Sequence, residues 1–160
     1  MNSPVCVDAS LTFKLVVDEP DSTLAHALWV EWQLAEVTII APTLWAYEMP
    51  SALRKRVHRG LLPAELEEDL VEAALGLPVR LLRPAGLHRR ASGLARRFNR
   101  PASYDAHYLA LAEMYTCPLW TGDERLFNAV RQELPWVYWL GNYRMPGVLH
   151  EEPTSYRVGS

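Results

Sequence analysis

The sequence contains few of the residues from which disulfide frameworks and zinc sites are built. Among its 160 residues there are only two cysteines, Cys6 and Cys117, and each lies in or beside an apolar run. Two cysteines are too few for a disulfide framework or a zinc site, so we expect buried free thiols. The histidines are not at the spacing of metal ligands, and we assign them no catalytic role.

Long hydrophobic stretches and an excess of positive charge are also absent. No apolar run reaches the roughly 20 residues that a membrane-spanning helix needs, and the beginning of the chain has no basic region followed by an apolar core and a cleavage site. We therefore expect no membrane partner and a cytoplasmic location. The net charge of -3 argues against strong bulk attraction to nucleic acid, although it leaves local basic patches open.

The composition that is present is ordinary for a globular domain, with 49% apolar and 22% charged residues. Short β-rich runs alternate with helical segments, an order that predicts an α/β fold with a parallel sheet covered on both faces. We expect a three-layer α/β/α domain with a central five-stranded parallel sheet over residues 1–140, followed by a C-terminal tail at 141–160. Strands are expected at 5–8, 37–40, 79–82, 119–121 and 136–139, and helices at 9–17, 22–35, 43–58, 63–75, 86–98, 103–114 and 123–132.

Local signals predict where several helices begin and end. Ser22 and Thr43 are suitable N-caps for the segments that follow them, and Gly60 is suitable as a C-cap. Pro50 falls inside the segment 43–58, where it removes a backbone donor and is expected to kink the helix or force it to restart.

Two aspartates come directly after predicted strands. Asp8 ends the first strand, and Asp123 follows the strand at 119–121. The carboxyl ends of parallel strands form the edge of the sheet at which ligands bind. If these two strands are adjacent, both carboxylates lie at that edge. Each aspartate could instead simply cap the helix that follows it.

Two further acids occur in unusually apolar helical segments. Glu48 lies among apolar residues of the segment 44–53, and Asp105 begins an almost wholly apolar helix. Alternatively, Glu48 is a solvated acid and Asp105 complements a helix dipole. A carboxylate close to the core needs a partner, and four carboxylates at one edge would repel unless a cation joined them. Oxygen ligands of this kind favour Mg²⁺ or Mn²⁺.

The segments around these acids resemble the ordered motifs of a known family. They read Val7-Asp8-Ala9-Ser10, Tyr47-Glu48 with Ala52-Leu53, Ser103-Tyr104-Asp105-Ala106 with Tyr108-Leu109-Ala110-Leu111-Ala112, and Thr121-Gly122-Asp123-Glu124-Arg125-Leu126. In this order within an α/β pattern they resemble PIN domains, and the nearest variety is the VapC-type toxin ribonuclease of toxin–antitoxin pairs. The resemblance covers about residues 5–130. It departs from the family's pattern at Ser51, where many members carry Asn, and at the neighbouring Pro50.

The resemblance implies a PIN-like fold and a Mg²⁺-dependent endoribonuclease, with Mn²⁺ as an alternative ion, that is the toxin of a type II toxin–antitoxin system. The catalytic residues that it implies are Asp8, Glu48, Asp105 and Asp123, of which Asp8, Asp105 and Asp123 bind the metal, with Ser10 and Thr121 in support. The implied partners are an RNA substrate, a cognate antitoxin protein and a second copy in a homodimer.

Other functions remain open beside this one. They are a PIN-domain RNA-processing nuclease without an antitoxin, and a non-catalytic PIN-like module that binds RNA or protein. A phosphatase with Asp8 as nucleophile is disfavoured, because Ser10 stands where such enzymes usually place a second aspartate.

Basic residues follow Glu48 and precede Asp105 in the sequence. Such residues can bind RNA phosphates, although solvated helix faces have the same composition. The arginines that we expect to bind RNA are Arg54, Arg56, Arg96, Arg97 and Arg100. No platform of mixed aromatic and basic residues for single strands is evident in the sequence.

Trp29 and Trp32 lie three residues apart on the predicted helix 22–35. Core packing is one interpretation of this pair. The other is that both residues are hydrophobic anchors for an antitoxin helix or a second subunit.

Overall fold

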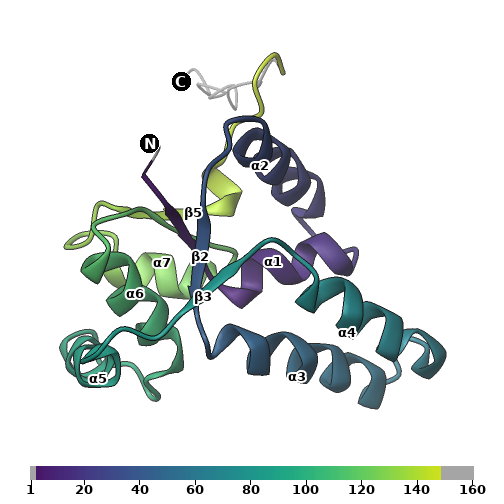
Figure 1. Cartoon of the computed structure of the whole chain (residues 1–160), viewed down its shortest axis with the longest axis horizontal. Coiled ribbons are helices and arrows are strands. Elements are labelled where there is room, and N and C mark those ends of the chain that lie inside the picture. The colour runs from purple at the N-terminus through teal and green to yellow at the C-terminus, as the bar shows by residue number, and fades with distance from the viewer. Residues whose placement is uncertain (1–2, 149–160) are drawn as a thin grey trace, which may run out of the picture.

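The computed structural model describes residues 3–148, which form a central sheet with helices on both sides (Figure 1). All strand pairings are parallel and the strand order is β3-β2-β1-β4-β5. The predicted three-layer α/β/α architecture with a five-stranded parallel sheet is therefore confirmed. The strands are β1 (Val5–Val7), β2 (Ile39–Pro42), β3 (Arg80–Leu82), β4 (Leu119–Thr121) and β5 (Val137–Trp139). The helices are α1 (Ala9–Val16), α2 (Ser22–Leu34), α3 (Trp45–His58), α4 (Glu67–Leu75), α5 (Leu87–Arg97), α6 (Tyr104–Met114) and α7 (Glu124–Val130).

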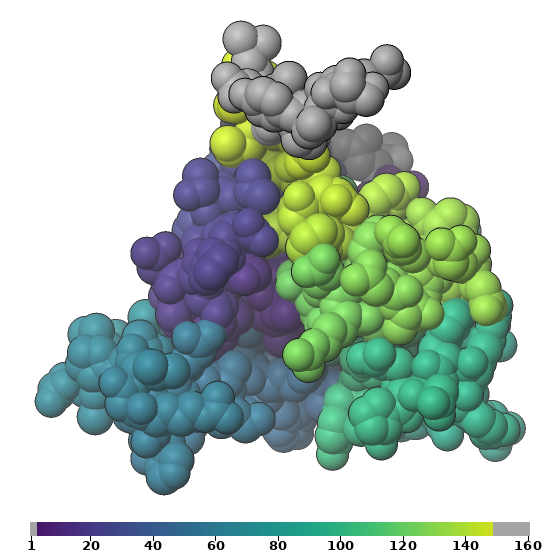
Figure 2. Space-filling view, turned by 180° about the vertical axis from the view of Figure 1, so that it is seen from behind, coloured from purple at the N-terminus to yellow at the C-terminus, as the bar shows by residue number. Residues whose placement is uncertain are grey.

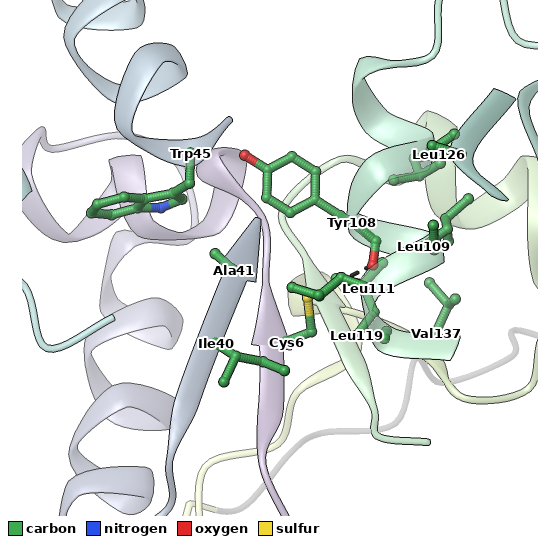
Figure 3. Packing of buried hydrophobic residues seen from close by; sticks show 14 of the residues in the cluster. Cys6, Ile40, Ala41, Trp45, Tyr108, Leu109, Leu111, Leu119, Leu126 and Val137 are labelled. Atoms are coloured by element: carbon green, nitrogen blue, oxygen red, sulfur yellow. Dashed lines mark hydrogen bonds between the residues drawn. The ribbon is translucent and has the colours of Figure 1, made fainter. Parts of the chain in front are cut away.

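The central strand β1 is buried along its whole length, as a strand covered on both faces must be. Its side chains alternate between two core clusters. Cys6 faces the larger cluster, which includes residues of α3, α5 and α6, whereas Val5 and Val7 face a second cluster formed with α2. Figure 3 shows the first cluster, in which Leu109 and Leu111 of α6 pack against the sheet. Cys6 and Cys117 are buried free thiols, as the sequence predicted.

Helix α3 runs unbroken from Trp45 to His58 with Pro50 inside it. Of the two outcomes expected at this proline, a kink or a restart, the restart is therefore wrong. Trp45, Met49 and Leu53 are each at most 2% exposed on the buried side of the helix. Burying side chains of this size contributes about 1.5–3 kcal/mol each, which outweighs the roughly 3 kcal/mol that an internal proline costs.

Several other helix ends differ from the predicted ones. The residue preceding α3 is Leu44 and that preceding α2 is Asp21, so neither Thr43 nor Ser22 is the cap. The Ser22 hydroxyl instead bridges the preceding loop, accepting from the Glu19 N–H and donating to the Val17 carbonyl. The predicted helix 63–75 is divided into a short 3₁₀ turn, Ala64–Leu66, and α4. Such deviations of a few residues arise where side-chain and tertiary contacts compete with local capping signals.

The chain after β5 packs against the domain beyond the predicted boundary at 140. Leu140 begins a 3₁₀ turn, and both Leu140 and Tyr143 are buried in the second cluster. The Tyr143 hydroxyl donates to the Glu31 carboxylate of α2 at 2.6 Å. Figure 2 shows this yellow segment beside the purple-indigo surface of α2. The rest of the predicted tail, residues 149–160, lies outside the described residues.

Within residues 3–148, no helix combines the length and the apolar character that crossing a membrane requires.

Candidate active site

Two of the predicted acids lie together at the carboxyl edge of the sheet. Strands β1 and β4 are adjacent, with Val7 paired to Trp120. Asp8 follows β1 and Asp123 follows β4, so both are at the ends of the two strands in the middle of the sheet. The condition on which the metal site was predicted, that these strands be neighbours, is therefore met.

Asp8 is held by three hydrogen bonds, although it is only 6% exposed. One carboxylate oxygen accepts from the Ser10 hydroxyl at 2.5 Å and from the Leu11 N–H at 3.2 Å. The other accepts from the Thr121 hydroxyl. Ser10 also accepts from the Gly122 N–H at 2.9 Å, which ties α1 to the loop after β4. The structure thus places both predicted supporting residues on Asp8.

The burial of Asp8 has an electrostatic cost. Loss of solvation raises the pKa of this carboxyl from 3.8 to about 6, against the opposing effect of the hydrogen bonds from Ser10, Thr121 and Leu11. The negative charge of Asp123 raises the pKa of Asp8 further. An ionised Asp8 would therefore be favoured by any nearby cation.

Glu48 lies in the first turn of α3 and accepts a hydrogen bond from Tyr108 of α6. The distance between the Tyr108 hydroxyl and Glu48 Oε1 is 2.5 Å. Burial raises the pKa of Glu48, the Tyr108 hydrogen bond lowers it, and the charge of Asp105 raises it. Burial and the neighbouring Glu48 raise the pKa of Tyr108, so this phenol stays a donor. Tyr108 lies in the motif that follows Asp105, but we predicted no role for it in the site, although a buried tyrosine hydroxyl usually has a partner.

The remaining two acids are engaged with groups of the protein. Asp105, in the first turn of α6, receives the Arg100 guanidinium through Nε and Nη2, each at 2.8 Å. Asp123 caps α7, accepting from the Arg125 and Leu126 N–H groups at 2.9 and 3.2 Å. Asp8 caps α1 through Leu11 in the same way. The alternative capping interpretation is therefore correct for both aspartates, and it is compatible with a further role.

A cleft of about 770 Å³ opens at this edge of the sheet, and Asp105 is not among the residues that line it. Glu48, Asp123 and Ser10 line it, whereas Asp8 lies beneath its surface. Four cationic side chains line the same cleft: Lys14, Lys55, Arg56 and Arg59. Carboxylates and cations in one cleft suit a ligand that carries phosphates and a divalent ion.

Of the five arginines predicted to bind RNA, Arg56 alone lines this cleft. It lies over the Phe13 ring, 5.4 Å from the ring centroid, and is ion-paired with Glu19. The others lie elsewhere: Arg54 pairs with Glu67 of α4, Arg97 with Glu133, and Arg100 with Asp105, while Arg96 is exposed on α5. Neighbouring arginines on a helix point in different directions. The sequence therefore predicted more arginines at the site than the structure places there.

Trp32 is a core residue. It is 6% exposed in the second cluster, and its ring meets Trp120 edge-to-face with the centroids 6.2 Å apart. Trp29 packs against the same cluster and is partly exposed. The core-packing interpretation therefore holds for Trp32, and the proposed pair of partner anchors is reduced to Trp29.

The donor atoms at this edge of the sheet are carboxylate and hydroxyl oxygens, which is the chemistry that Mg²⁺ and Mn²⁺ prefer. The donor type therefore fits the predicted ions. Among residues 3–148, however, no three His, Cys, Asp or Glu side chains are grouped so that they could hold a metal ion. Asp8, Asp105 and Asp123 are thus not assembled as a ready ligand set in this arrangement.

Comparison with known proteins supports the fold and leaves the activity open. No family model and no curated protein matches the sequence significantly. Among solved structures, the crystal structure of PAE2754 from Pyrobaculum aerophilum is similar, with a TM-score of 0.60 over 88% of this chain and 93% of that chain at 20% identity. Identity this low indicates a shared fold, and a fold alone does not assign a function.

Proposed function

We propose that this protein is a Mg²⁺-dependent endoribonuclease that acts in the cytoplasm as the toxin of a type II toxin–antitoxin system, with Mn²⁺ as the alternative ion. The observation that supports this function best is the position of Asp8 and Asp123 at the ends of adjacent central strands, with Glu48 facing the same cation-rimmed cleft. The order of motifs in the sequence points to the same activity.

In this proposal Asp8, Asp105 and Asp123 would hold the metal, directly or through water. When bound, a divalent ion lowers the pKa of a water molecule and neutralises charge on the phosphate that is cleaved. Glu48 would be a further ligand or the base that orients the attacking water, and Tyr108 fixes the carboxylate of Glu48 through their hydrogen bond. Ser10 and Thr121 fix Asp8. The lysine and arginine side chains at the rim hold the flanking phosphates.

Both contacts of Arg100 go to the same oxygen of Asp105, Oδ2, so in this proposal Oδ1 is the atom that would bind the metal. Both side chains are partly exposed, at 27% and 19%, so the pair is neither fully buried nor freely solvated. The incoming phosphates offer Arg100 a replacement partner of the same charge as Asp105. Transfer of Arg100 to a phosphate of the substrate would make Oδ2 of Asp105 available to the metal as well.

The proposed antitoxin and homodimer rest on the resemblance of the sequence motifs to toxin ribonucleases. The antitoxin would hold the nuclease inactive by covering its active site. Co-expression with the product of a small adjacent gene, followed by size-exclusion chromatography, would test this part of the proposal. A PIN-domain nuclease of RNA maturation would keep its activity and lack such a partner.

A second candidate is a non-catalytic PIN-like module that binds RNA or protein. The observation in its favour is that Asp105 is paired with Arg100, and that no group of three potential ligands is assembled within the described residues. Such a module would bind RNA without cleaving it, with or without a divalent ion.

The experiment that separates the two is cleavage of a mixed RNA pool by the purified, partner-free protein with Mg²⁺, Mn²⁺ or EDTA. Asp8→Asn and Asp105→Asn are assayed in parallel, with Asp69→Asn as a matched control, because Asp69 is exposed on α4 away from the cleft. We expect metal-dependent cleavage by the wild type and the control and none by the two site variants. Full activity of Asp8→Asn, or no cleavage with either metal, would contradict the proposal.

A further inference from the structure

Two tyrosines lie at the mouth of the cleft with their rings in solvent. Tyr47 is 74% exposed and Tyr104 is 63% exposed, and both line the cleft. Neither side chain makes a hydrogen bond or a ring contact within the part of the chain that the structure describes. Both are more exposed than Tyr115 and Tyr138, at 41% and 43%, so these two rings contribute little to folding in their present position.

Each of these tyrosines is the neighbour of a proposed catalytic acid. Tyr47 precedes Glu48 on α3, and Tyr104 precedes Asp105 at the start of α6. The rings therefore come from two different elements that also supply the acidic residues. A phosphodiester bound in the cleft would therefore have one tyrosine ring on the α3 side and another on the α6 side.

The same face of α3 carries cations beyond Glu48. Lys55 and Arg59 both line the cleft and follow Glu48 by two and three helical turns. Both side chains are exposed, and within residues 3–148 neither forms an ion pair. Over the roughly 16 Å from Glu48 to Arg59, this face of the helix thus offers positive charges to more than one phosphate.

From this arrangement we infer that Tyr47 and Tyr104 are base-stacking residues, each contacting a base beside the phosphate that is cleaved. The inference deepens the proposed nuclease function and rests on it. Every base has a flat π-face, so any base of the RNA can stack on a tyrosine. Stacking does require bases that are not already paired and stacked in a duplex. The sequence showed no platform of aromatic and basic residues, because the two tyrosines and the cations are brought together only by the packing of α3 and α6 around the cleft.

The test is binding of a fluorescent single-stranded oligoribonucleotide in EDTA, where metal-dependent cleavage cannot proceed, compared with the same strand annealed to its complement. Tyr47→Ala and Tyr104→Ala are each expected to raise the Kd for the single strand about tenfold. Tyr47→Phe and Tyr104→Phe keep the ring and are expected to bind as the wild type does. Tyr115→Ala is the matched control, since Tyr115 is 41% exposed at the end of α6 and does not line the cleft.

Two further measurements complete the test. The urea midpoints of the alanine variants should equal that of the wild type, because the rings are exposed. With Mg²⁺, kcat/KM on the single strand should fall about tenfold for the same variants and stay constant for Tyr115→Ala.

The outcomes separate this inference from the proposed function. If the wild type cleaves RNA and the alanine variants bind and cleave as well as it does, base stacking is refuted and the nuclease stands. Equal loss in the phenylalanine variants would assign the effect to the hydroxyl and also refute stacking, as would equal affinity for the duplex. A wild type that neither binds nor cleaves RNA would refute both.

Discussion

Replacing Asp8 by asparagine tests how much it costs this protein to bury a negative charge at the end of its central strand. Asp8 is 6% exposed, and burial raises its pKa from 3.8 to about 6. Asparagine has the same shape and also serves as an N-cap, so the Leu11 N–H keeps an acceptor. The substitution therefore removes the charge and leaves most of the hydrogen bonding in place.

The direction of the effect follows from the raised pKa. A folded protein that binds the Asp8 proton more tightly than the unfolded chain gains stability below about pH 4, and it loses that stability as the pH rises through about 6. The difference between the two pKa values, about two pH units, corresponds to about 3 kcal/mol. The stability of Asp8→Asn relative to the wild type should therefore rise by up to about 3 kcal/mol between about pH 4 and pH 7.5.

Urea unfolding followed by tryptophan fluorescence at several pH values in this range measures the effect. Asp69→Asn is the control and should not change the pH dependence, because Asp69 is exposed on α4. A difference between Asp8→Asn and the wild type that is constant with pH would refute the reasoning. A divalent ion at Asp8 would offset the cost, so millimolar Mg²⁺ near neutral pH should raise the wild-type midpoint and leave that of Asp8→Asn unchanged.

Two more substitutions test the geometry around the cleft. Tyr108→Phe removes the donor to Glu48, so it should cost about 1 kcal/mol in urea unfolding. It should also move the acid limb of the pH–rate profile to higher pH, because that hydrogen bond lowers the pKa of Glu48; an unmoved limb would exclude Glu48 as the base. Gly122→Ala would place a Cβ 2.9 Å from the Ser10 carbonyl oxygen, a backbone atom, and should destabilise by about 1–3 kcal/mol with reduced cleavage. Gly93→Ala, in open space on α5, should instead stabilise by about 0.5–1 kcal/mol, and equal melting temperatures for the two variants would contradict this account.

The sequence by itself determined which segments are strands and which are helices. Short β-rich runs alternating with helical segments specified a parallel sheet, because parallel strands must be joined by crossovers that cover both faces. The same pattern put Asp8 and Asp123 at the carboxyl edge. Hydrophobic periodicity reports on local structure and burial, and these two properties are sufficient for such conclusions.

Only the tertiary structure decided which distant side chains meet. The hydrogen bond from Tyr108 to Glu48 joins α6 to α3, and the sequence of neither helix identifies the other helix as its partner. Arg54 and Arg56 look equivalent in the sequence, yet Arg54 pairs with α4 and Arg56 faces the cleft. Helix α3 continues through Pro50 because its buried face contributes more than the lost hydrogen bond costs. The local sequence pattern determines which segments become helices and strands. Which of these elements pack together depends on contacts between distant segments, and those contacts form only when the chain folds.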